Sequence, residues 1–510
     1  MLESDTLEVL RLVQSVKNTF VSINWIPPEI LSLIPDYLNN EGADLVTLTH
    51  VCRSWRDIFT SRSSLWASLN CTNVRKTLAY IERSKSIPLD ICLDDGSYHN
   101  DALLLVAPHI DRLGSLTIRG SVNIIPDLIK HFSHPAPLLW KLEVGLDVYR
   151  THHLVFPTTL FNGDLSSLRE LSLAGAIQLP WRNLSSLGVF KHYQPASANP
   201  PSTAQLLDLL ESAPLLRDIE LHHPASTPQN APSGRVVPLP LLEILNLNSP
   251  TAHTALLKHL SIPTGASLAL DYYFSEDEPL TLDYLPEDIN NLNNLPHITS
   301  VSLYLGMVQH RARFDGPSGR LYLRGSWGSG DPLYVVRSQI FRTLRKLNLS
   351  SAQRLVVTKY TTSLGKRVEK SPIFQTLLLM NGIHTLTLIK CNNLSFIRAL
   401  NPENNDAGTV ACPNLEELVL YIKRLDWLHA SELKEMASAR SGRHAKLPSI
   451  TIIGLGKVLP EEEVSALRAH FPCVKYEADV ESPEWGTFPG DAGPNDDEGD
   501  WWVSRLLVGN

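Results

Sequence analysis

Residues 25–66 read WIPPEILSLIPDYLNNEGADLVTLTHVCRSWRDIFTSRSSLW. The prolines at 27 and 28 fit the first turn of a helix, where the N–H that proline lacks has no partner. An apolar stripe at helical spacing follows and consists of Ile30, Leu31, Ile34 and Leu38. After a polar break at 39–42, a second helical stripe consists of Leu45, Leu48, Val51, Cys52 and Trp55. A turn at 61–64 and the pair Leu65–Trp66 close the stretch. We predict three short helices, which are marginal by size alone and gain stability by docking on a partner.

A second pattern, Leu-x-x-Leu-x-Leu with Ile or Val allowed, recurs after residue 90. Its copies begin at residues 113, 139, 168, 184, 216, 242, 298, 344, 383, 415 and 447. The final Leu-x-Leu predicts a short strand with both apolar side chains on one face. One such unit cannot bury its apolar side, but stacked units bury a shared core. The spacing is irregular, so the pattern predicts an irregular leucine-rich solenoid, with an ordinary α/β domain as the alternative.

Helical segments are predicted between these strands, at 202–214, 431–442 and 459–472. Residues 309–325 alternate apolar and polar around Asp-Gly-Pro-Ser-Gly, which predicts a β-hairpin. The arginines of this hairpin form either a solvated face or a partner site; they are Arg311, Arg313, Arg320 and Arg324. A proline-rich loop is predicted at 222–240.

The formal net charge of −8 is concentrated in the last part of the sequence. From Glu477 onward there are nine acidic residues and one basic residue, so residues 1–476 are close to neutral. A neutral body argues against nucleic acid as a partner. No apolar run has the roughly 18 to 20 residues of a membrane span, and residues 1–22 predict an amphipathic helix rather than a signal peptide. We expect the acidic tail at 477–510 to be disordered.

The sequence offers no constellation that predicts chemistry. No two of the six cysteines lie closer than 19 residues, which favours free thiols over a disulfide scaffold, a metal site or a redox motif. The stretch 454–457 (GLGK) lacks the spacing and hydroxyl of a phosphate-binding loop. The histidine pairs at 152–153 and 222–223 are predicted to be surface residues. We therefore assign no catalytic, cofactor-binding or metal-binding residue and expect no enzyme activity.

The opening segment resembles an F-box of the kind found in mushroom-forming (basidiomycete) fungi. The resemblance rests on the opening 26–31 (IPPEIL), the centre 48–56 (LTHVCRSWR) and the close 65–66, and continues loosely through 80–91. It implies docking on a Skp-type adaptor and, through it, on a cullin. The implied adaptor-binding residues, some of which must instead be core, are Ile26, Pro27, Pro28, Ile30, Leu31, Ile34, Leu45, Leu48, Val51, Cys52, Trp55, Leu65 and Trp66. For Trp55 the sequence leaves two roles open: a core residue or a direct contact of the adaptor.

The predicted architecture is α/β. The predicted boundaries are an amphipathic helix at 1–22, a three-helix F-box at 23–70, a linker helix and first strand at 71–93, the solenoid at 94–476 with a curved parallel sheet and helices outside, and the tail at 477–510. The resemblance implies the substrate-recognition subunit of a Skp–cullin–F-box ubiquitin ligase in the cytoplasm or nucleus. The alternative is an interaction scaffold without a ligase role. Candidate target contacts, for a protein that the sequence does not identify, are the exposed strand positions, the segments 222–240 and 309–331, Trp327, and Trp501–Trp502.

Overall fold

The computed structural model describes most of residues 2–477. The segments outside this description are 38–42, 95–97, 122–124, 147–153, 156–159, 176, 179–183, 194–200, 223–233, 249–252, 275–282, 306–308, 328–332, 360–371, 406, 423–427, 455–460 and 478–510. The chain divides into two compact units, residues 1–187 and 188–510. Most of the predicted loop at 222–240 and the predicted disordered tail, with Trp501 and Trp502, lie outside the described residues.

The first unit begins with helices. They are α1 (Leu2–Thr19), η1 (Ser22–Trp25), α2 (Pro28–Leu31), η2 (Ile34–Tyr37), α3 (Ala43–Thr49), α4 (Arg53–Ser61), η3 (Ser63–Trp66) and α5 (Val74–Ser84). The prediction of one continuous second helix was wrong, because extended backbone at Cys52 (φ −158°, ψ 176°) separates α3 from α4. The predicted amphipathic helix and linker helix are present as α1 and α5.

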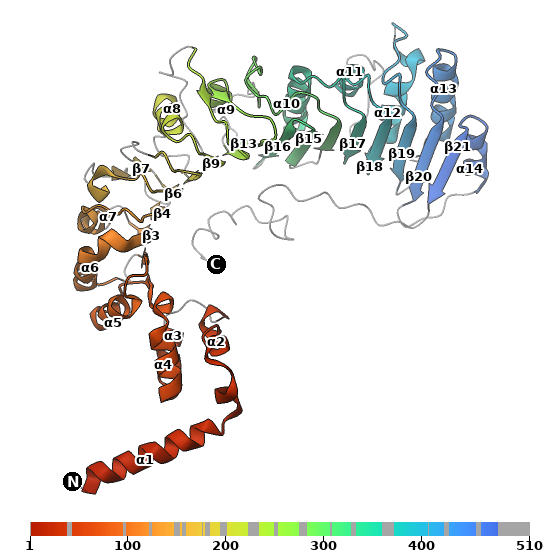
Figure 1. The fold of residues 1–510 in the computed structure, drawn as a ribbon. Coiled ribbons are helices and arrows are strands. Elements are labelled where there is room, and N and C mark those ends of the chain that lie inside the picture. Colours follow the sequence, from red (N-terminus) through yellow and green to blue (C-terminus); the bar gives the residue numbers. More distant parts are fainter. Residues whose placement is uncertain are drawn as a thin grey trace. The chain divides into compact units, whose positions relative to one another are not determined.

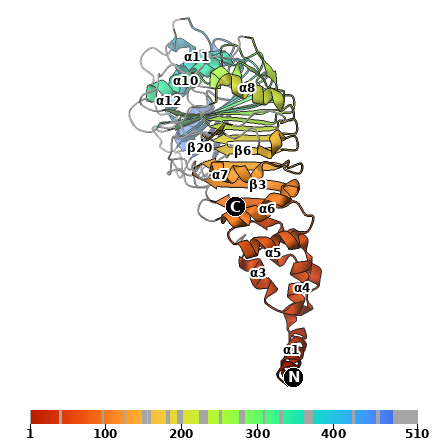
Figure 2. The same ribbon diagram turned by 90° about the vertical axis from the view of Figure 1, so that its left-hand side faces the viewer.

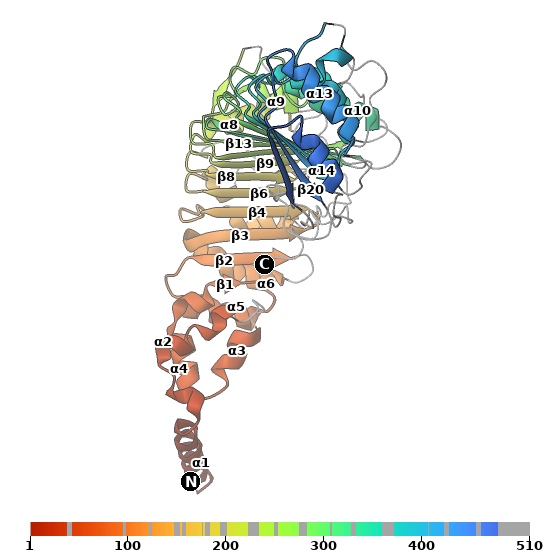
Figure 3. The same cartoon turned by 90° about the vertical axis from the view of Figure 1, so that its right-hand side faces the viewer.

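A parallel sheet follows in the first unit (Figure 3). Its described strands pair in the order β1 (Ser68–Leu69), β2 (Leu89–Asp94), β3 (Leu113–Gly120), β4 (Lys141–Leu146) and β6 (Glu170–Ala174). The sheet thus starts one strand earlier than predicted, at β1 inside the expected F-box boundary. Between the strands lie α6 (Asn100–Val106), η4 (Ala107–Arg112), α7 (Ile125–Ile129), η5 (Lys130–Phe132) and η6 (Leu160–Gly163), and β5 (Leu154–Val155) pairs with β7 (Ile177–Gln178).

The second unit contains a larger, mostly parallel sheet with helices on one side (Figures 1 and 2). Its parallel strands are β8 (Val189–Tyr193), β9 (Asp218–His222), β11 (Ile244–Asn248), β13 (Ser267–Phe274), β14 (Ser300–Leu305), β16 (Gly319–Trp327), β17 (Arg354–Thr358), β18 (Thr385–Ile389), β19 (Glu417–Ile422), β20 (Ser449–Gly454) and β21 (Cys473–Glu477). The intervening helices are α8 (Thr203–Ser212), α9 (His253–Leu257), α10 (Leu333–Lys346), α11 (Pro372–Leu379), α12 (Asn393–Leu400), η8 (Pro402–Asn404), α13 (Ala430–Ser441) and α14 (Glu461–Arg468), and β10 (Val237–Pro238) pairs with β12 (Leu260–Ser261).

Two of the predicted helix starts can be compared with the structure. Ser202 caps α8 in a capping box with Gln205, as the sequence at 202–214 leads one to expect. By contrast, α13 begins at Ala430 after His429, so Ser431 lies inside the helix and is not its N-cap.

The predicted hairpin is present, and both of its strands belong to the sheet. Strand β15 (Gln309–Gly316) is antiparallel to β14 on one side and to β16 on the other. Strand β16 then pairs in parallel with β13, and β14 pairs in parallel with β17. The spatial order is therefore β13–β16–β15–β14–β17. After β13 the chain leaves two strand positions empty and forms β14 beyond them. Strands β15 and β16 then fill these two positions.

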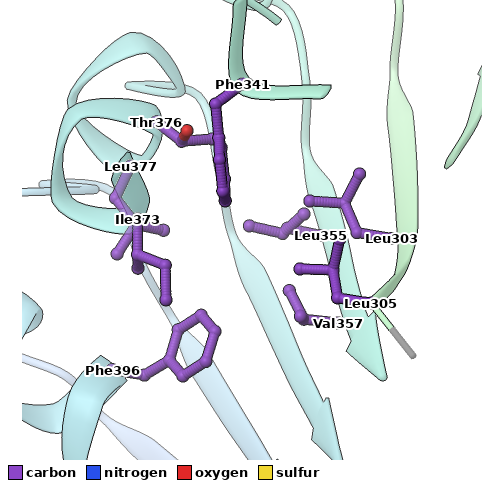
Figure 4. Close-up of a pocket in the computed structure, with 9 residues that line it drawn as sticks. All are labelled: Leu303, Leu305, Phe341, Leu355, Val357, Ile373, Thr376, Leu377 and Phe396. Atoms are coloured by element: carbon purple, nitrogen blue, oxygen red, sulfur yellow. The ribbon is translucent and has the colours of Figure 1, made fainter. Parts of the chain in front are cut away.

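The apolar residues of the strand pattern lie on the side of the sheet that faces the helices. Leu386, Leu418 and Ile450 are register neighbours on β18, β19 and β20, and all three are fully buried. A small cavity lies in this layer, lined by side chains that Figure 4 labels: Leu303, Leu305, Phe341, Leu355, Val357, Ile373, Thr376, Leu377 and Phe396. Its lining offers one hydroxyl, too few polar partners to hold water or a polar ligand. It is a packing defect of the core.

Candidate functional site

The first candidate site is built by the short helices between Asn24 and Trp66. Helix α2 begins at Pro28 with Pro27 as its N-cap, as the missing N–H of proline favours. The guanidinium of Arg56 on α4 donates to the carbonyl of Thr49 at 3.0 Å and so ties α3 to α4. Arg62 donates to the carbonyl of Ser32 and ties the end of α4 to α2. These links set the relative positions of three helices that are each too short to be stable alone.

Two tryptophans form the core of this helical module. Trp55 is only 5% exposed; its indole N–H donates to Asn24 Oδ1 at 2.7 Å, and its ring meets Phe59 edge-on. Trp66 is fully buried and donates to the carbonyl of Phe59 at 2.8 Å. The question left open for Trp55 is therefore answered by the structure: it supports the surface from beneath.

Trp66 also joins the module to the helix that follows it. Its ring meets Tyr80 of α5 edge-on, with 4.9 Å between the ring centroids. The guanidinium of Arg83, also on α5, lies 4.3 Å from the centroid of the Trp66 ring. The same indole therefore packs against both the module and the linker helix.

The thirteen residues predicted to contact an adaptor fall into three classes. The buried ones, which lie in the core as was expected of some of the thirteen, are Leu31, Leu45, Trp55 and Trp66. The half-buried ones are Ile26, Ile34, Leu48, Cys52 and Leu65. The exposed ones are Pro27, Pro28, Ile30 and Val51. Ile30 is 54% exposed although it was predicted to share a face with buried Leu31, because α2 ends after four residues and the stripe does not continue.

The helical module exposes six large apolar side chains. We group them as the apolar face; its members are Ile23, Trp25, Ile30, Leu33, Tyr37 and Val51. Trp25 is 70% exposed, yet its indole N–H is held by the carbonyl of Thr19 at 2.7 Å. Sequence reasoning missed Ile23, Trp25, Leu33 and Tyr37. The signal that could have found them is their position off the predicted buried stripe, since an apolar residue there has no core to enter.

The second candidate site is the outer surface of the inserted strands. We call it the arginine face; its members are Tyr304, Arg311, Arg313, Arg320, Tyr322 and Arg324. Arg313 contacts Asp315 at 2.7 Å and lies 5.5 Å from the ring centroid of Tyr322. The carboxylate of Asp315 holds the Arg313 side chain and raises its pKa above the usual value. Placing these arginines on one rigid sheet makes a partner site geometrically possible.

At strands β8 and β9 the charges on the outer surface of the sheet differ from those of the arginine face. Glu220 there is surrounded by Lys191 at 3.1 Å, His222 at 3.3 Å and the Tyr193 hydroxyl at 2.8 Å. Burial disfavours its charge, but these partners outweigh burial and lower the pKa of Glu220 to about 2. His222 is half-buried beside this carboxylate, which corrects the prediction of a surface histidine without a nearby acid.

Among the described residues, no group of three or more His, Cys, Asp or Glu side chains is placed to hold a metal ion. None of the six cysteines forms a disulfide. Burial raises the pKa of the Cys71 and Cys412 thiols to about 12, so both stay protonated at neutral pH and are poor nucleophiles. No helix in the described part of the chain is both long and apolar enough to span a bilayer.

Comparison with known families agrees with the geometry of the first site. Residues 23–72 match the family model described as F-box-like. F-box domains typically bind Skp-type adaptors, and such a domain points to a role in ubiquitin ligase complexes or in protein interaction. No curated protein matches the chain.

Proposed function

We propose that this chain is the substrate-recognition subunit of a Skp–cullin–F-box ubiquitin ligase. The F-box-like domain binds the adaptor and through it the cullin, and the large sheet binds the target protein. The chain performs no bond chemistry in this scheme. It brings a target close to a ubiquitin donor, so its contribution to the rate is proximity.

The apolar face carries the first half of the proposal. Ile30, Trp25 and Val51 are each at least half exposed within the segment that matches the F-box-like family. Several large apolar side chains exposed on one small helical module favour a protein partner over solvent. The buried tryptophans hold this surface in shape.

The second half rests on the leucine pattern, which we interpret as an irregular leucine-rich solenoid of the fungal type. Successive copies of the pattern occupy neighbouring parallel strands in register, such as Leu116 with Leu142 and Leu142 with Leu171. A target protein would then bind the outer strand positions and the loops at the strand ends. Six cysteines that form no disulfide fit a reducing compartment, the cytoplasm or nucleus, where such ligases act.

Adaptor binding is tested by co-purification of the tagged chain with a Skp-type adaptor from fungal extract. Ile30→Asp and Val51→Asp each place a charge on the apolar face and should weaken binding by 30-fold or more, about 2 kcal/mol. The matched control is Leu104→Asp, because Leu104 is 56% exposed on α6, outside the F-box-like segment. Pro27→Ala gives a milder probe of the same surface. Equal adaptor recovery with all four variants would refute the assignment of this face.

The alternative is an interaction scaffold without a ligase role, which binds the adaptor but promotes no ubiquitin transfer. Deleting residues 24–70 separates the two functions. If the ligase proposal holds, proteins that co-purify with the deleted chain should have longer half-lives in cells than they have beside the full chain. Unchanged half-lives would favour the scaffold.

A further inference from the structure

Helix α1 presents an exposed apolar stripe. Between residues 9 and 20, the exposed large apolar side chains are Val9, Leu10, Leu12, Val13, Val16 and Phe20. Four of them, Val9, Val13, Val16 and Phe20, follow one another at spacings of 4, 3 and 4 residues, the heptad spacing of a seam between two helices. We call these four the α1 stripe. Their exposed fractions run from 47% at Val13 to 74% at Phe20, so the described part of the chain leaves the stripe uncovered.

The last turn of α1 is fixed to the helical module that follows it. The side-chain amide of Asn24 donates to the carbonyl of Asn18 at 2.7 Å, and its oxygen accepts the indole N–H of Trp55 at 2.7 Å. The indole N–H of Trp25 donates to the carbonyl of Thr19. Because these contacts hold the end of the helix, a partner meets a preformed stripe and less entropy is lost on binding.

The charged residues of α1 are divided between its two halves. The acids Glu3, Asp5 and Glu8 all belong to the first half, and the bases Arg11 and Lys17 belong to the second. A parallel copy of the helix would place like charges at the same level. An antiparallel copy places the acidic half of one helix beside the basic half of the other and opposes the two helix dipoles. The charges of α1 are therefore complementary to those of a second, antiparallel α1.

We propose that α1 pairs antiparallel with α1 of a second copy of this chain, through the α1 stripe. When the two 18-residue helices overlap almost fully, Val9 of each copy lies opposite Val13 of the other. The pair is two-fold symmetric, so every contact occurs twice. The overlapped helices form a seam about 27 Å long. The pairing depends neither on the adaptor nor on ubiquitin transfer.

Two other occupants fit the α1 stripe less well. A helix that lies on a membrane surface has a polar face rich in lysine and arginine, whereas α1 has two basic residues against three acidic ones. An adaptor is expected on the F-box-like segment at 23–72, and α1 ends before that segment begins. A second copy of α1 satisfies both the apolar spacing and the charges.

An antiparallel pair places the two F-box-like modules at opposite ends of the seam, because each α1 leads directly into its own module. Neither module then blocks the other. Two joined copies can engage two sites on one target, and the second binding event becomes intramolecular. This consequence for target binding rests on the proposed function, but the pairing itself does not.

Sedimentation equilibrium of the purified full chain measures the pairing directly. At about 10–100 μM we expect a species of twice the 56.8 kDa of one chain. Val13→Asp should weaken the dimer about 100-fold, because it places two carboxylates in an apolar seam. The matched control is Gln14→Asp, which adds the same charge at an exposed position away from the stripe and should change the affinity by less than about threefold. Thermal unfolding of each variant checks that it is folded.

Reversing the charge of Lys17 reports the direction of the pairing. In an antiparallel pair, Lys17→Glu sets a new acid beside the acidic half of the other copy and should weaken the dimer about fivefold at low salt. In a parallel pair, residue 17 of one copy lies beside residue 17 of the other, so the like-charge repulsion and the affinity would stay the same. Arg11→Glu is the matched control, because its position lies on the side of the helix away from the stripe and the change should have a smaller effect.

Four results would overturn the proposal. A chain that stays monomeric over the whole concentration range does not pair through α1. A dimer that Val13→Asp leaves intact has its interface elsewhere. A monomeric chain that loses adaptor recovery in Val13→Asp uses the stripe as part of the adaptor surface. A monomeric chain that binds phosphatidylserine-containing vesicles, and loses this binding in Val13→Asp, uses the stripe on a membrane.

Discussion

Replacing Arg440 by methionine should destabilise the C-terminal part of the second unit. Arg440 on α13 is 0% exposed. Its guanidinium donates to the carbonyls of Ala411 at 2.7 Å, Cys412 at 2.8 Å and Ala445 at 3.2 Å. Burial lowers the pKa of Arg440, and its described hydrogen-bond partners are carbonyl oxygens. One buried cation thus holds two loops that lie about 30 residues apart in the sequence.

The size of the expected loss of stability follows from the carbonyls that Arg440→Met leaves without the guanidinium donor. The Leu400 carbonyl at 3.4 Å is a fourth acceptor, and the Cys412 carbonyl keeps the N–H of Leu415 at 3.1 Å. Each buried acceptor left without a donor costs about 1–3 kcal/mol, and relief from burying the charge offsets part of this loss. Cys412 has φ 47°, so this loop has little freedom to turn its carbonyl toward water. We expect a net loss of about 3–5 kcal/mol for Arg440→Met, in line with other broken buried charge networks. Arg440→Lys should lose less, because an ammonium still reaches some of the carbonyls.

Hydrogen exchange read by mass spectrometry is the suitable assay, because a chain of this size need not unfold in one step. A local loss of 3–5 kcal/mol should speed amide exchange in residues 411–422 and 445–454 by about 10²- to 10⁴-fold. Lys434→Met, a half-buried change on the same helix, is the control and should shift exchange little. Exchange in Arg440→Met that is as slow as in the wild type would show that desolvation of the charge outweighs its hydrogen bonds, and would refute the reasoning.

Three further predictions concern the second unit. Gly325→Ala should lower the thermal midpoint by several degrees, since its Cβ would lie 2.1 Å from the buried His310 ring, whereas Gly145→Ala meets nothing closer than 3.6 Å and should be neutral. Burial lowers the pKa of His310 to about 3, so as the pH falls the unfolded chain binds a proton before the folded chain does. The free energy of unfolding should therefore fall by up to about 1.4 kcal/mol per pH unit from pH 6.5 down to about 3. His310→Gln should flatten this slope in denaturant titrations, and an unchanged slope would show that His310 is not its source. Ser202→Ala removes a capping box and should cost about 1 kcal/mol, measured as faster amide exchange in α8.

The buried face of the sheets was predictable because its signal is local. In the pattern at 415–420, Leu415, Leu418 and Leu420 are all buried, as their spacing predicts. The cap of α8 was predictable for the same reason, since Ser202 and Gln205 are three residues apart. These inferences need only the geometry of a strand or of one helical turn.

Strand order was not predictable, because it depends on contacts between distant segments. The hairpin at 309–325 has a clear turn signal, yet nothing in those residues states that β16 will pair with β13. The prediction of which side chains are exposed in the F-box-like module failed for a similar reason. Ile30 follows the helical period, but the period has no meaning once α2 ends at Leu31. Whether a short stripe is buried depends on what packs against it.

The inserted strands β14, β15 and β16 also affect how the chain is made. Strand β13 ends at Phe274, but its neighbour β16 begins only at Gly319, about 45 residues later. At synthesis rates of roughly 5–20 residues per second, the edge of β13 waits about 2–9 s for its partner. Strand β14 emerges first and runs in the same direction as β16, so it can compete for that edge during synthesis. To reach the observed strand order, the edge of β13 must therefore stay unpaired after β14 has been synthesised, until β16 follows.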